Sequence, residues 1–225
     1  MTNENKPEGA ESSPPDSRDE PIPFVLDGLP EKLEILKAPD LFTDEDHPDH
    51  SPSVDWEEVP DFTLGEDAEL IKLTSIRQLR GGALRLLKQA TREMLLVTPD
   101  LEFPRFDNED FVLAVSELVR RSKYTVCRIL VGDPINAIRE HHRLIPLLRR
   151  MSSRIEIRQL HADDHDAKEA WMVVDNIAVL RCTDRQPWQG GLTPRSAADA
   201  KRLREQFHIW WERAVLIPDF REFRA

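Results

Sequence analysis

The sequence is poor in cysteine and has no long apolar run, and both shortages exclude whole classes of protein. Cys127 and Cys182 are the only cysteines among 225 residues, and each lies in an apolar stretch typical of a strand. Two such residues make neither a disulfide framework nor a zinc site, so we expect free thiols packed as small hydrophobes. No apolar h-region of a secretory signal is visible, and no run approaches the ~18 apolar residues of a membrane span. The sequence therefore predicts a soluble, cytoplasmic protein, and nothing in it indicates a cofactor.

Positive charge is scarce in the first third of the chain. Residues 1–68 hold 20 Asp or Glu against 4 Lys or Arg, whereas residues 69–225 hold 22 acidic and 27 basic residues. The acidity thus belongs to the N-terminal third. Because the remainder is mildly basic, the net charge of -11 argues only weakly against a nucleic-acid ligand.

Residues 1–66 are predicted to form an acidic, mostly disordered region, because most of this stretch holds too little apolar surface to offset the entropy of ordering. Residues 22–42 are richer in Leu, Ile and Phe. This segment is interpreted either as solvated tail or as a docking segment for the domain or for a partner protein. Residues 67–225 are predicted to form one domain.

Strand and helix patterns alternate from residue 67 onward. The order mixes crossover connections with a hairpin, which predicts an α/β domain with a mixed sheet and helices on both faces. Pro146 should kink or split its helix, and Gly81-Gly82 should either interrupt theirs or permit close packing. The expected strands are 68–73, 93–98, 125–131, 155–160, 171–174, 177–181 and 215–217; the expected helices are 75–90, 107–121, 134–151 and 196–214; residues 184–195 are expected to be a loop.

Three stretches carry a resemblance to a known family. Val97-Thr98-Pro99 ends one strand, Thr125–Val131 is rich in Val and Ile, and Trp171–Asn176 is an apolar run that ends in Asp-Asn. This pattern resembles one half of the phospholipase D-like superfamily over about residues 68–217. The resemblance implies a phospholipase D-like half domain, with the family motif H-x-K-x4-D on its β-hairpin. In that motif His attacks phosphorus, Lys stabilises the phosphate oxygens and Asp orients the His.

Only the last residue of that motif is retained. With Asp175 as the motif Asp, Ala170 stands at the Lys position and Lys168 at the His position. The resemblance therefore implies a degenerate, uncharacterised bacterial relative, in which Lys168, Asp175 and Arg181 are the residues expected to contact a ligand. The nearest histidine is His165.

Two functions remain open from the sequence. The first is a non-catalytic binding or scaffold module for a phosphate-bearing ligand, such as nucleic acid bound weakly, or for a protein partner. The second is a phosphodiesterase or phosphoryl-transfer enzyme in which His165 or His161 replaces the nucleophile and acts with Lys168 and Asp175. Family halves often dimerise around their site, so the chain is expected to be a monomer or a homodimer.

Two clusters of polar residues allow further interpretations. His161, Asp163 and His165 have spacings that suit a divalent metal, although a solvated loop is the simpler interpretation and no metal is predicted. Basic residues gather around Arg77–Lys88, Arg149–Arg158 and Lys201–Arg204, either as solvated helix faces or as phosphate-binding patches on which the acidic N-terminal region could compete. On the last helix, Trp210 is assigned to the buried stripe, and Trp211 to the C-terminal tail or to an interface.

Overall fold

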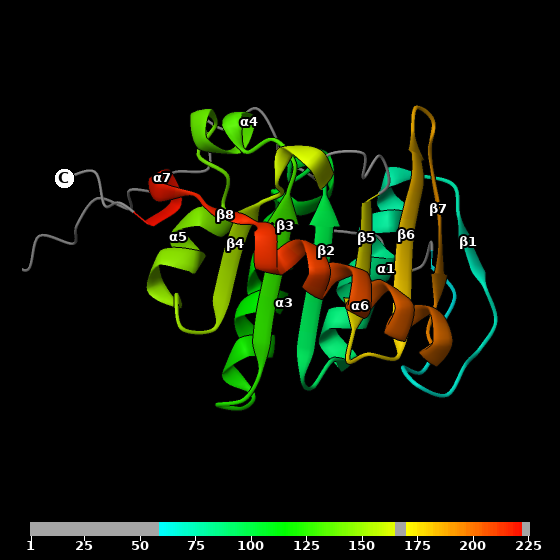
Figure 1. Cartoon of the computed structure of the whole chain (residues 1–225). Coiled ribbons are helices and arrows are strands. Elements are labelled where there is room, and N and C mark those ends of the chain that lie inside the picture. Colours follow the sequence, from blue (N-terminus) through cyan, green and yellow to red (C-terminus); the bar gives the residue numbers. More distant parts are fainter. Residues whose placement is uncertain (1–58, 165–169, 222–225) are drawn as a thin grey trace, which may run out of the picture. The chain divides into compact units, whose positions relative to one another are not determined.

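The computed structural model describes residues 59–164 and 170–221, which are built around one eight-stranded sheet (Figure 1). The order across the sheet is β1-β7-β6-β5-β2-β3-β4-β8. Strands β2, β3 and β4 are parallel to one another, and all other neighbouring pairs are antiparallel. The strands are β1 (Ile71–Leu73), β2 (Glu93–Thr98), β3 (Val126–Val131), β4 (Ile155–Gln159), β5 (Ala170–Val174), β6 (Ala178–Arg185), β7 (Trp188–Thr193) and β8 (Val215–Leu216). The helices are α1 (Ile76–Gln89), α2 (Phe103–Phe106), α3 (Glu109–Arg120), α4 (Ile135–Arg139), α5 (Leu144–Arg150), α6 (Ala197–Arg213) and α7 (Pro218–Arg221), with a 3-10 turn at Ala162–Asp164.

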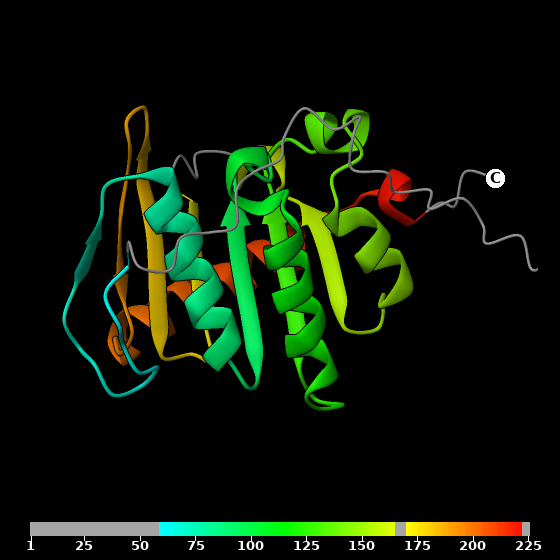
Figure 2. The same ribbon diagram turned by 180° about the vertical axis from the view of Figure 1, so that it is seen from behind.

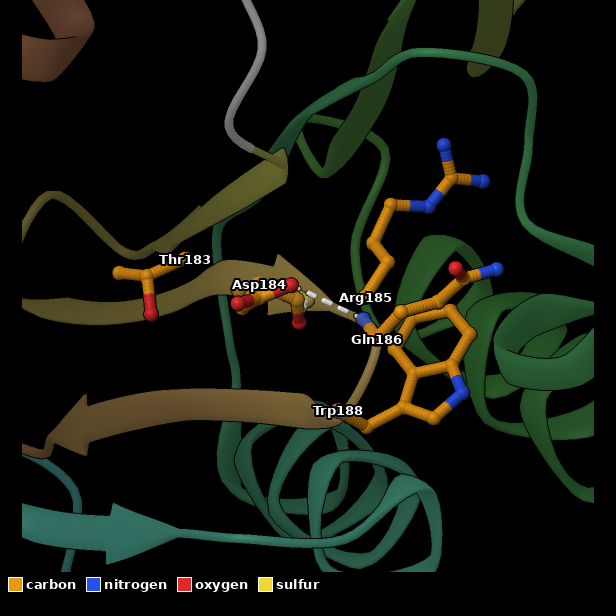
Figure 3. A pocket seen from close by; sticks show the side chains of 6 residues that line it. Thr183, Asp184, Arg185, Gln186 and Trp188 are labelled. Atoms are coloured by element: carbon orange, nitrogen blue, oxygen red, sulfur yellow. Dashed lines mark hydrogen bonds between the residues drawn. The ribbon is translucent and has the colours of Figure 1, made fainter.

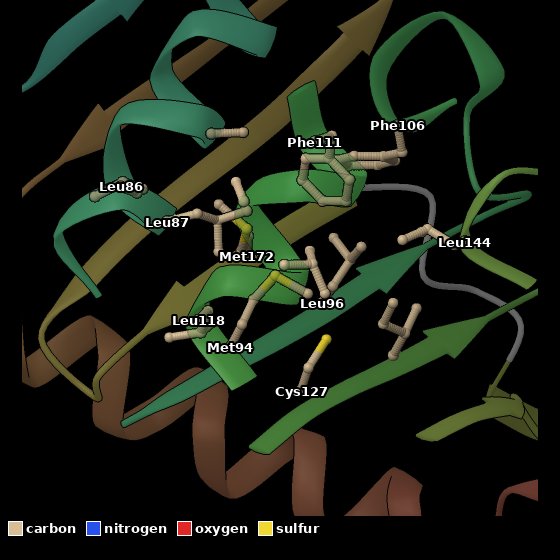
Figure 4. Packing of buried hydrophobic residues seen from close by; sticks show 14 of the residues in the cluster. Leu86, Leu87, Met94, Leu96, Phe106, Phe111, Leu118, Cys127, Leu144 and Met172 are labelled. Atoms are coloured by element: carbon tan, nitrogen blue, oxygen red, sulfur yellow. The ribbon is translucent and has the colours of Figure 1, made fainter. Parts of the chain in front are cut away.

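Helices lie on both faces of the sheet, as the sequence predicted. Figure 2 shows α1, α3 and α5 over one face, and Figure 1 shows α6 crossing the other. Met94 and Leu96 of β2 belong to the buried cluster beneath α1 and α3 (Figure 4), whereas Leu95 and Val97 belong to the cluster beneath α6. A strand covered on both faces needs apolar side chains at every position, which explains the continuous apolar run of β2.

Two helices begin at residues whose side chains cap them. The side chain of Ser75 accepts a hydrogen bond from the backbone N–H three residues on at 3.1 Å, and Asn108 does the same at 2.8 Å. α1 continues through Gly82 without a break. A Cβ at this position would lie 3.0 Å from the Leu192 side chain. Its missing side chain therefore lets α1 lie close to the sheet.

The segment predicted as a helix kinked or split at Pro146 forms two helices. α4 ends at Arg139 and α5 begins at Leu144, with His141 between them in the left-handed region at φ 53°. Pro146 lies in the first turn of α5, where a missing N–H costs no intrahelical hydrogen bond. The predicted split is therefore present, but its position is wrong, because the break comes before the proline.

Residues 184–195, predicted as a loop, contain the end of β6 and all of β7. A Cβ at Gly190 would overlap the carbonyl oxygen of Arg181 on the neighbouring strand, so glycine allows the two strands to approach closely. Glycines usually weaken a strand pattern, so the sequence pattern did not predict β7.

α6 buries Trp211 rather than Trp210. Trp211 is 6% exposed and stacks on Phe207 at a centroid distance of 5.3 Å, with the guanidinium carbon of Arg158 4.3 Å from its ring centroid. Trp210 is only half-buried. Trp210 thus packs against the buried cluster as predicted, but Trp211 is the more deeply buried of the two, and Arg158 lies against its ring.

Packing begins upstream of residue 67. Val59 is 2% exposed and Phe62 is 8% exposed, and both belong to the larger buried cluster. The backbone N–H of Leu64 donates to the side-chain oxygen of Gln89 at 2.8 Å. The boundary at residue 67 stays a prediction, as does the docking role of residues 22–42, which lie outside the described residues. Across the two described ranges, no helix is long and apolar enough to cross a membrane.

Candidate functional site at the carboxyl edge of the sheet

The parallel strands β2, β3 and β4 end at one edge of the sheet, which we call the carboxyl edge. Strand β6 runs in the same direction, so the tip of the β6–β7 hairpin reaches this edge too (Figure 1). β5 runs antiparallel to β2 and therefore begins here with Ala170. Open α/β sheets bind their ligands outside this edge, so it is the first place to look for a site.

A buried pair of opposite charges, Glu102 and Arg105, lies just after β2. Arg105 Nη1 donates to Glu102 Oε2 at 2.7 Å, and both side chains are 0% exposed. Arg185 reaches the pair from the hairpin tip, with its Nε 3.3 Å from Glu102 Oε1. Its Nη2 also donates to both carboxylate oxygens of Asp100 at 2.8 Å. These four residues, Asp100, Glu102, Arg105 and Arg185, are called the carboxyl-edge cluster.

Burial leaves the cluster incompletely hydrogen-bonded. Within the part of the chain that the structure describes, Arg105 Nε and Nη2 have no hydrogen-bond partner, and Glu102 Oε1 has only the ion-pair contact with Arg185. Burial raises the pKa of Glu102, and the positive charges of Arg105 and Arg185 oppose that rise. An unmet buried polar group costs about 1–3 kcal/mol. Such a costly group in the edge where ligands bind is typical of a functional site.

The backbone that carries Glu102 is strained. Leu101 and Glu102 have φ angles of 63° and 35°, in the left-handed region that non-glycine residues rarely adopt. Asp100 Oδ1 accepts a hydrogen bond from the Glu102 N–H at 3.1 Å, which helps to hold this turn. Strain of this kind collects at functional sites, where the surrounding structure supports it.

An open cavity of about 680 Å³ lies beside the hairpin tip (Figure 3). Figure 3 shows Arg185, Gln186 and Trp188 around the tip, where the Gln186 N–H donates to Asp184 Oδ1 at 2.9 Å. Cys182 Sγ donates to the Asp184 carbonyl at 3.2 Å, and burial raises the pKa of the thiol. Cys182 is therefore a thiol at neutral pH, and it adds no nucleophile to the site. The cavity is lined by Cys182, Thr183, Asp184, Arg185, Gln186 and Trp188.

Ala170 is the residue that the resemblance to the phospholipase D-like superfamily aligns with the motif Lys. It is 1% exposed and pairs with Cys182 across β5 and β6. A buried methyl group offers no charge to a phosphate. His165 and Lys168, the other candidates on this segment, lie outside the described residues.

Asp175 lies at the opposite edge of the sheet, in the turn between β5 and β6. Its carboxylate accepts hydrogen bonds from the N–H groups of Thr91, Arg92 and Glu93 at 2.7, 2.7 and 2.9 Å. β5 places about 16 Å of strand between this turn and the carboxyl edge. Asp175 thus ties the turn to the start of β2. Its convergence with His165 and Lys168 stays a prediction.

Arg181 projects from the middle of β6 on the face that α6 covers. Its Nη2 lies 3.9 Å from Asp199 Oδ1 in the first turn of α6. About 10 Å of strand separates Arg181 from the turn that holds Asp175. The two residues therefore occupy different parts of the fold, and their shared role in ligand binding stays a prediction.

An arginine side chain from α6 contacts the turn that the sequence indicated as a weak metal candidate. Arg213, from the end of α6, donates to Asp164 Oδ1 at 3.0 Å and to Asp163 Oδ2 at 2.9 Å, with Nη2 3.3 Å from His161 Nδ1. This guanidinium neutralises the carboxylates that a metal would need. Among the described residues no three metal-ligating side chains gather, and His165 lies outside them.

His142 is a second buried titratable group near this edge. It is fully buried, its ring centroid lies 4.9 Å from that of Phe103, and its Nδ1 accepts a hydrogen bond from the Leu144 N–H at 3.2 Å. Burial lowers the pKa of His142, although the carboxylate of Asp107 opposes this. The ring is therefore neutral at pH 7.

Sequence reasoning missed the carboxyl-edge cluster. Its signal was present, because Asp100, Glu102 and Arg105 follow within seven residues of the strand that ends in Thr98-Pro99. Arg185, however, comes from a segment that was predicted as a loop. Its contact with Asp100 depends on β7, which the glycines concealed.

Comparison with solved structures shows a shared fold. The chain is similar to TrmBL2, an archaeal chromatin protein with a novel mode of DNA binding, at 15% identity and a TM-score of 0.50 over 66% of this chain and 54% of that one. It is also similar to Nuc from Salmonella typhimurium, a phospholipase D family member (14% identity, TM-score 0.46, 62% of this chain and 89% of that one). NucT from Helicobacter pylori shows 9% identity and a TM-score of 0.47 over 66% of this chain and 98% of that one. The chain spans about half the length of the chromatin protein, and at these identities the likeness concerns the fold alone.

Sequence comparison places the chain in a family. Among curated proteins, none matches it. A family described as "Domain of unknown function (DUF7931)" matches residues 75–223, which run from the cap of α1 past the end of α7. This match covers more than half of the sequence, and the chain therefore belongs to the DUF7931 family.

Proposed function

We propose that this domain is a non-catalytic binding or scaffold module of phospholipase D-like fold, which takes a phosphate-bearing ligand or a protein partner. The buried methyl group of Ala170, at the position of the motif Lys, is the observation that carries this proposal. At the same edge of the sheet, Glu102 and Asp100 place carboxylates where a phosphodiester would need cations. The cations that are present, Arg105 and Arg185, are engaged with those carboxylates.

The test is hydrolysis of bis(p-nitrophenyl) phosphate by the full chain, compared with a chain carrying His165→Ala and Lys168→Ala. The expected rate is the same for both chains and equals that of buffer. Turnover by the natural chain that disappears in the double variant would overturn the proposal and establish the enzyme.

A phosphoryl-transfer enzyme with a displaced histidine is the second candidate, and the position of His161 favours it. This residue follows β4 at the carboxyl edge, its side chain is 43% exposed, and Asp163 and Arg213 contact its Nδ1. Attack by Nε2 requires the ring proton to lie on Nδ1, where Asp163 Oδ2 at 3.4 Å could accept it in place of the hydrogen bond that the Asp163 N–H donates to Nδ1. Turnover that survives His165→Ala but is lost in His161→Ala would support this candidate and remove His165 as the nucleophile.

A further inference from the structure

We propose that the opposite edge of the sheet binds single-stranded nucleic acid through Arg92, Arg120, Lys123 and Tyr124. This edge holds the amino ends of β2, β3 and β4, and we call it the amino edge. The inference rests on the proposed function only in taking the domain as a binding module. It names both the partner and the surface, and that surface is distinct from the carboxyl edge.

Three turns form a fixed platform along the amino edge (Figure 2). Arg121, after α3, donates to the carbonyl oxygens of Ala90 and Lys88 at the end of α1. Arg154, before β4, donates to the carbonyl oxygen of Val119 at 3.0 Å and also to that of Ser122. The turns after α1, α3 and α5 are therefore linked directly, although they lie more than 30 residues apart in the sequence.

The platform carries positive charge that is not paired with carboxylates. Arg92, Arg120 and Lys123 are exposed, and within the described ranges none of them pairs with a carboxylate. Arg120 ends α3, where a cation also favours the helix dipole. Arg92 and Lys123 lie in turns outside any helix, so the dipole does not explain them.

Several other basic groups of the domain are already engaged. Some of these engaged residues belong to the basic clusters that the sequence suggested as phosphate-binding patches. Those clusters therefore offer fewer unpaired cations than their composition suggests. Arginine side chains of this kind donate to backbone carbonyls or pair with carboxylates, as do Arg80, Arg85, Arg149, Arg158, Arg202 and Arg204.

Tyr124 gives the platform an aromatic surface. It is 78% exposed, and Lys123 Nζ lies 4.9 Å from its ring centroid. An exposed aromatic ring among cations is the arrangement that binds single strands, because the ring stacks on a base while the cations contact the backbone phosphates. A double helix keeps its bases stacked inside, and an acidic peptide has no base to stack. The combination therefore favours a single strand.

The test is fluorescence anisotropy of a labelled oligo-dT of about 20 nucleotides with the full chain at low salt, which limits screening of the platform. Three phosphate contacts predict a log–log salt slope of about -2. The double substitution Arg92→Glu/Lys123→Glu is expected to weaken binding by about 10-fold or more and to reduce that slope. Tyr124→Ala is expected to weaken binding about 5-fold or more with the slope unchanged, since stacking is not ionic.

The matched control is Arg139→Glu/Lys201→Glu, which makes the same change in charge on α4 and α6, outside the platform. It is expected to leave the affinity within about 2-fold. Absence of binding by the natural chain, or equal losses in the two double variants, would overturn the proposal. A normal affinity in Tyr124→Ala would also overturn it and would leave a surface for an acidic peptide. Hydrolysis of bis(p-nitrophenyl) phosphate does not depend on this surface, so failure here is separate from failure of the proposed function.

Discussion

The two edges of the sheet hold their charged residues in opposite ways. At the carboxyl edge, Glu102 and Arg105 are buried against each other, and Arg185 and Asp100 complete a cluster with unmet hydrogen bonds. At the amino edge, the side chains of Arg92 and Lys123 are exposed. The hydrogen bonds around them are made by other groups: Asp175 accepts from the backbone N–H of Arg92, and Arg121 donates to the carbonyl oxygen of Ala90. At the carboxyl edge, the unmet hydrogen bonds lower the stability of the fold, and the paired charges leave little unpaired charge for a ligand. At the amino edge the charges cost the fold little and are not paired with carboxylates.

The largest expected effect belongs to the carboxyl edge. Arg105→Ala leaves the Glu102 carboxylate buried with only the longer contact to Arg185. Removing one partner of a buried ion pair lowers the free energy of unfolding by about 3–5 kcal/mol. Urea denaturation at pH 7 measures this change.

The control for that change is Arg120→Ala at the amino edge, where a surface substitution is expected to alter stability by less than about 0.5 kcal/mol. Replacement of both buried partners, in Glu102→Leu/Arg105→Met, is expected to cost less than Arg105→Ala alone. Similar losses in Arg105→Ala and Arg120→Ala would contradict the proposed difference between the two edges.

A smaller loss is expected from Asp175, the acidic residue that the amino edge uses for structure. Asp175→Ala removes the acceptor for three backbone N–H groups of the chain around Arg92, and it places alanine at φ 52°. Together these effects are expected to lower the free energy of unfolding by about 2 kcal/mol. Asp175→Asn tolerates that φ and retains one acceptor oxygen, so it should lose about half as much. Oligo-dT binding by folded Asp175→Asn should persist, and its loss would show that Asp175 acts on the ligand rather than on the fold.

Local signals were sufficient to predict most of the fold. The caps at Ser75 and Asn108 and the unbroken apolar run of β2 each point to one element, because capping and burial act within a few residues. The break before α5 was misplaced because Pro146 is harmless in a first turn, which depends on where the helix begins. β7 was missed because its glycines serve a contact with another strand.

The candidate site was harder to predict than the fold, since its residues meet only in three dimensions. Arg185 reaches Asp100 across 85 residues of sequence. The platform at the amino edge likewise joins Arg92 to Lys123 through hydrogen bonds made by Arg121, which no spacing rule reveals. The family register did locate Ala170 and Asp175 on one hairpin, but it did not show that about 16 Å of strand separates Asp175 from the carboxyl edge.

The smallest expected effect is a dependence of stability on pH that arises near the carboxyl edge. Burial lowers the pKa of His142 below the ~6.5 of an unfolded chain. Between those two values the unfolded state binds more protons, so the free energy of unfolding falls as the pH falls, by up to about 1.4 kcal/mol per pH unit. The contribution is fully present above about pH 6.5 and declines as the pH falls below that value. The raised pKa of Glu102 acts in the opposite direction, because its protonation favours the folded state, so the two must be separated.

Urea denaturation of His142→Asn, which keeps an acceptor near Nδ1, should show a weaker decline in the free energy of unfolding between about pH 7 and 5.5 than the natural chain. His141→Asn is the matched control, since His141 is exposed and asparagine tolerates its φ of 53°. If His141→Asn rather than His142→Asn removes the decline, the buried histidine is not its source.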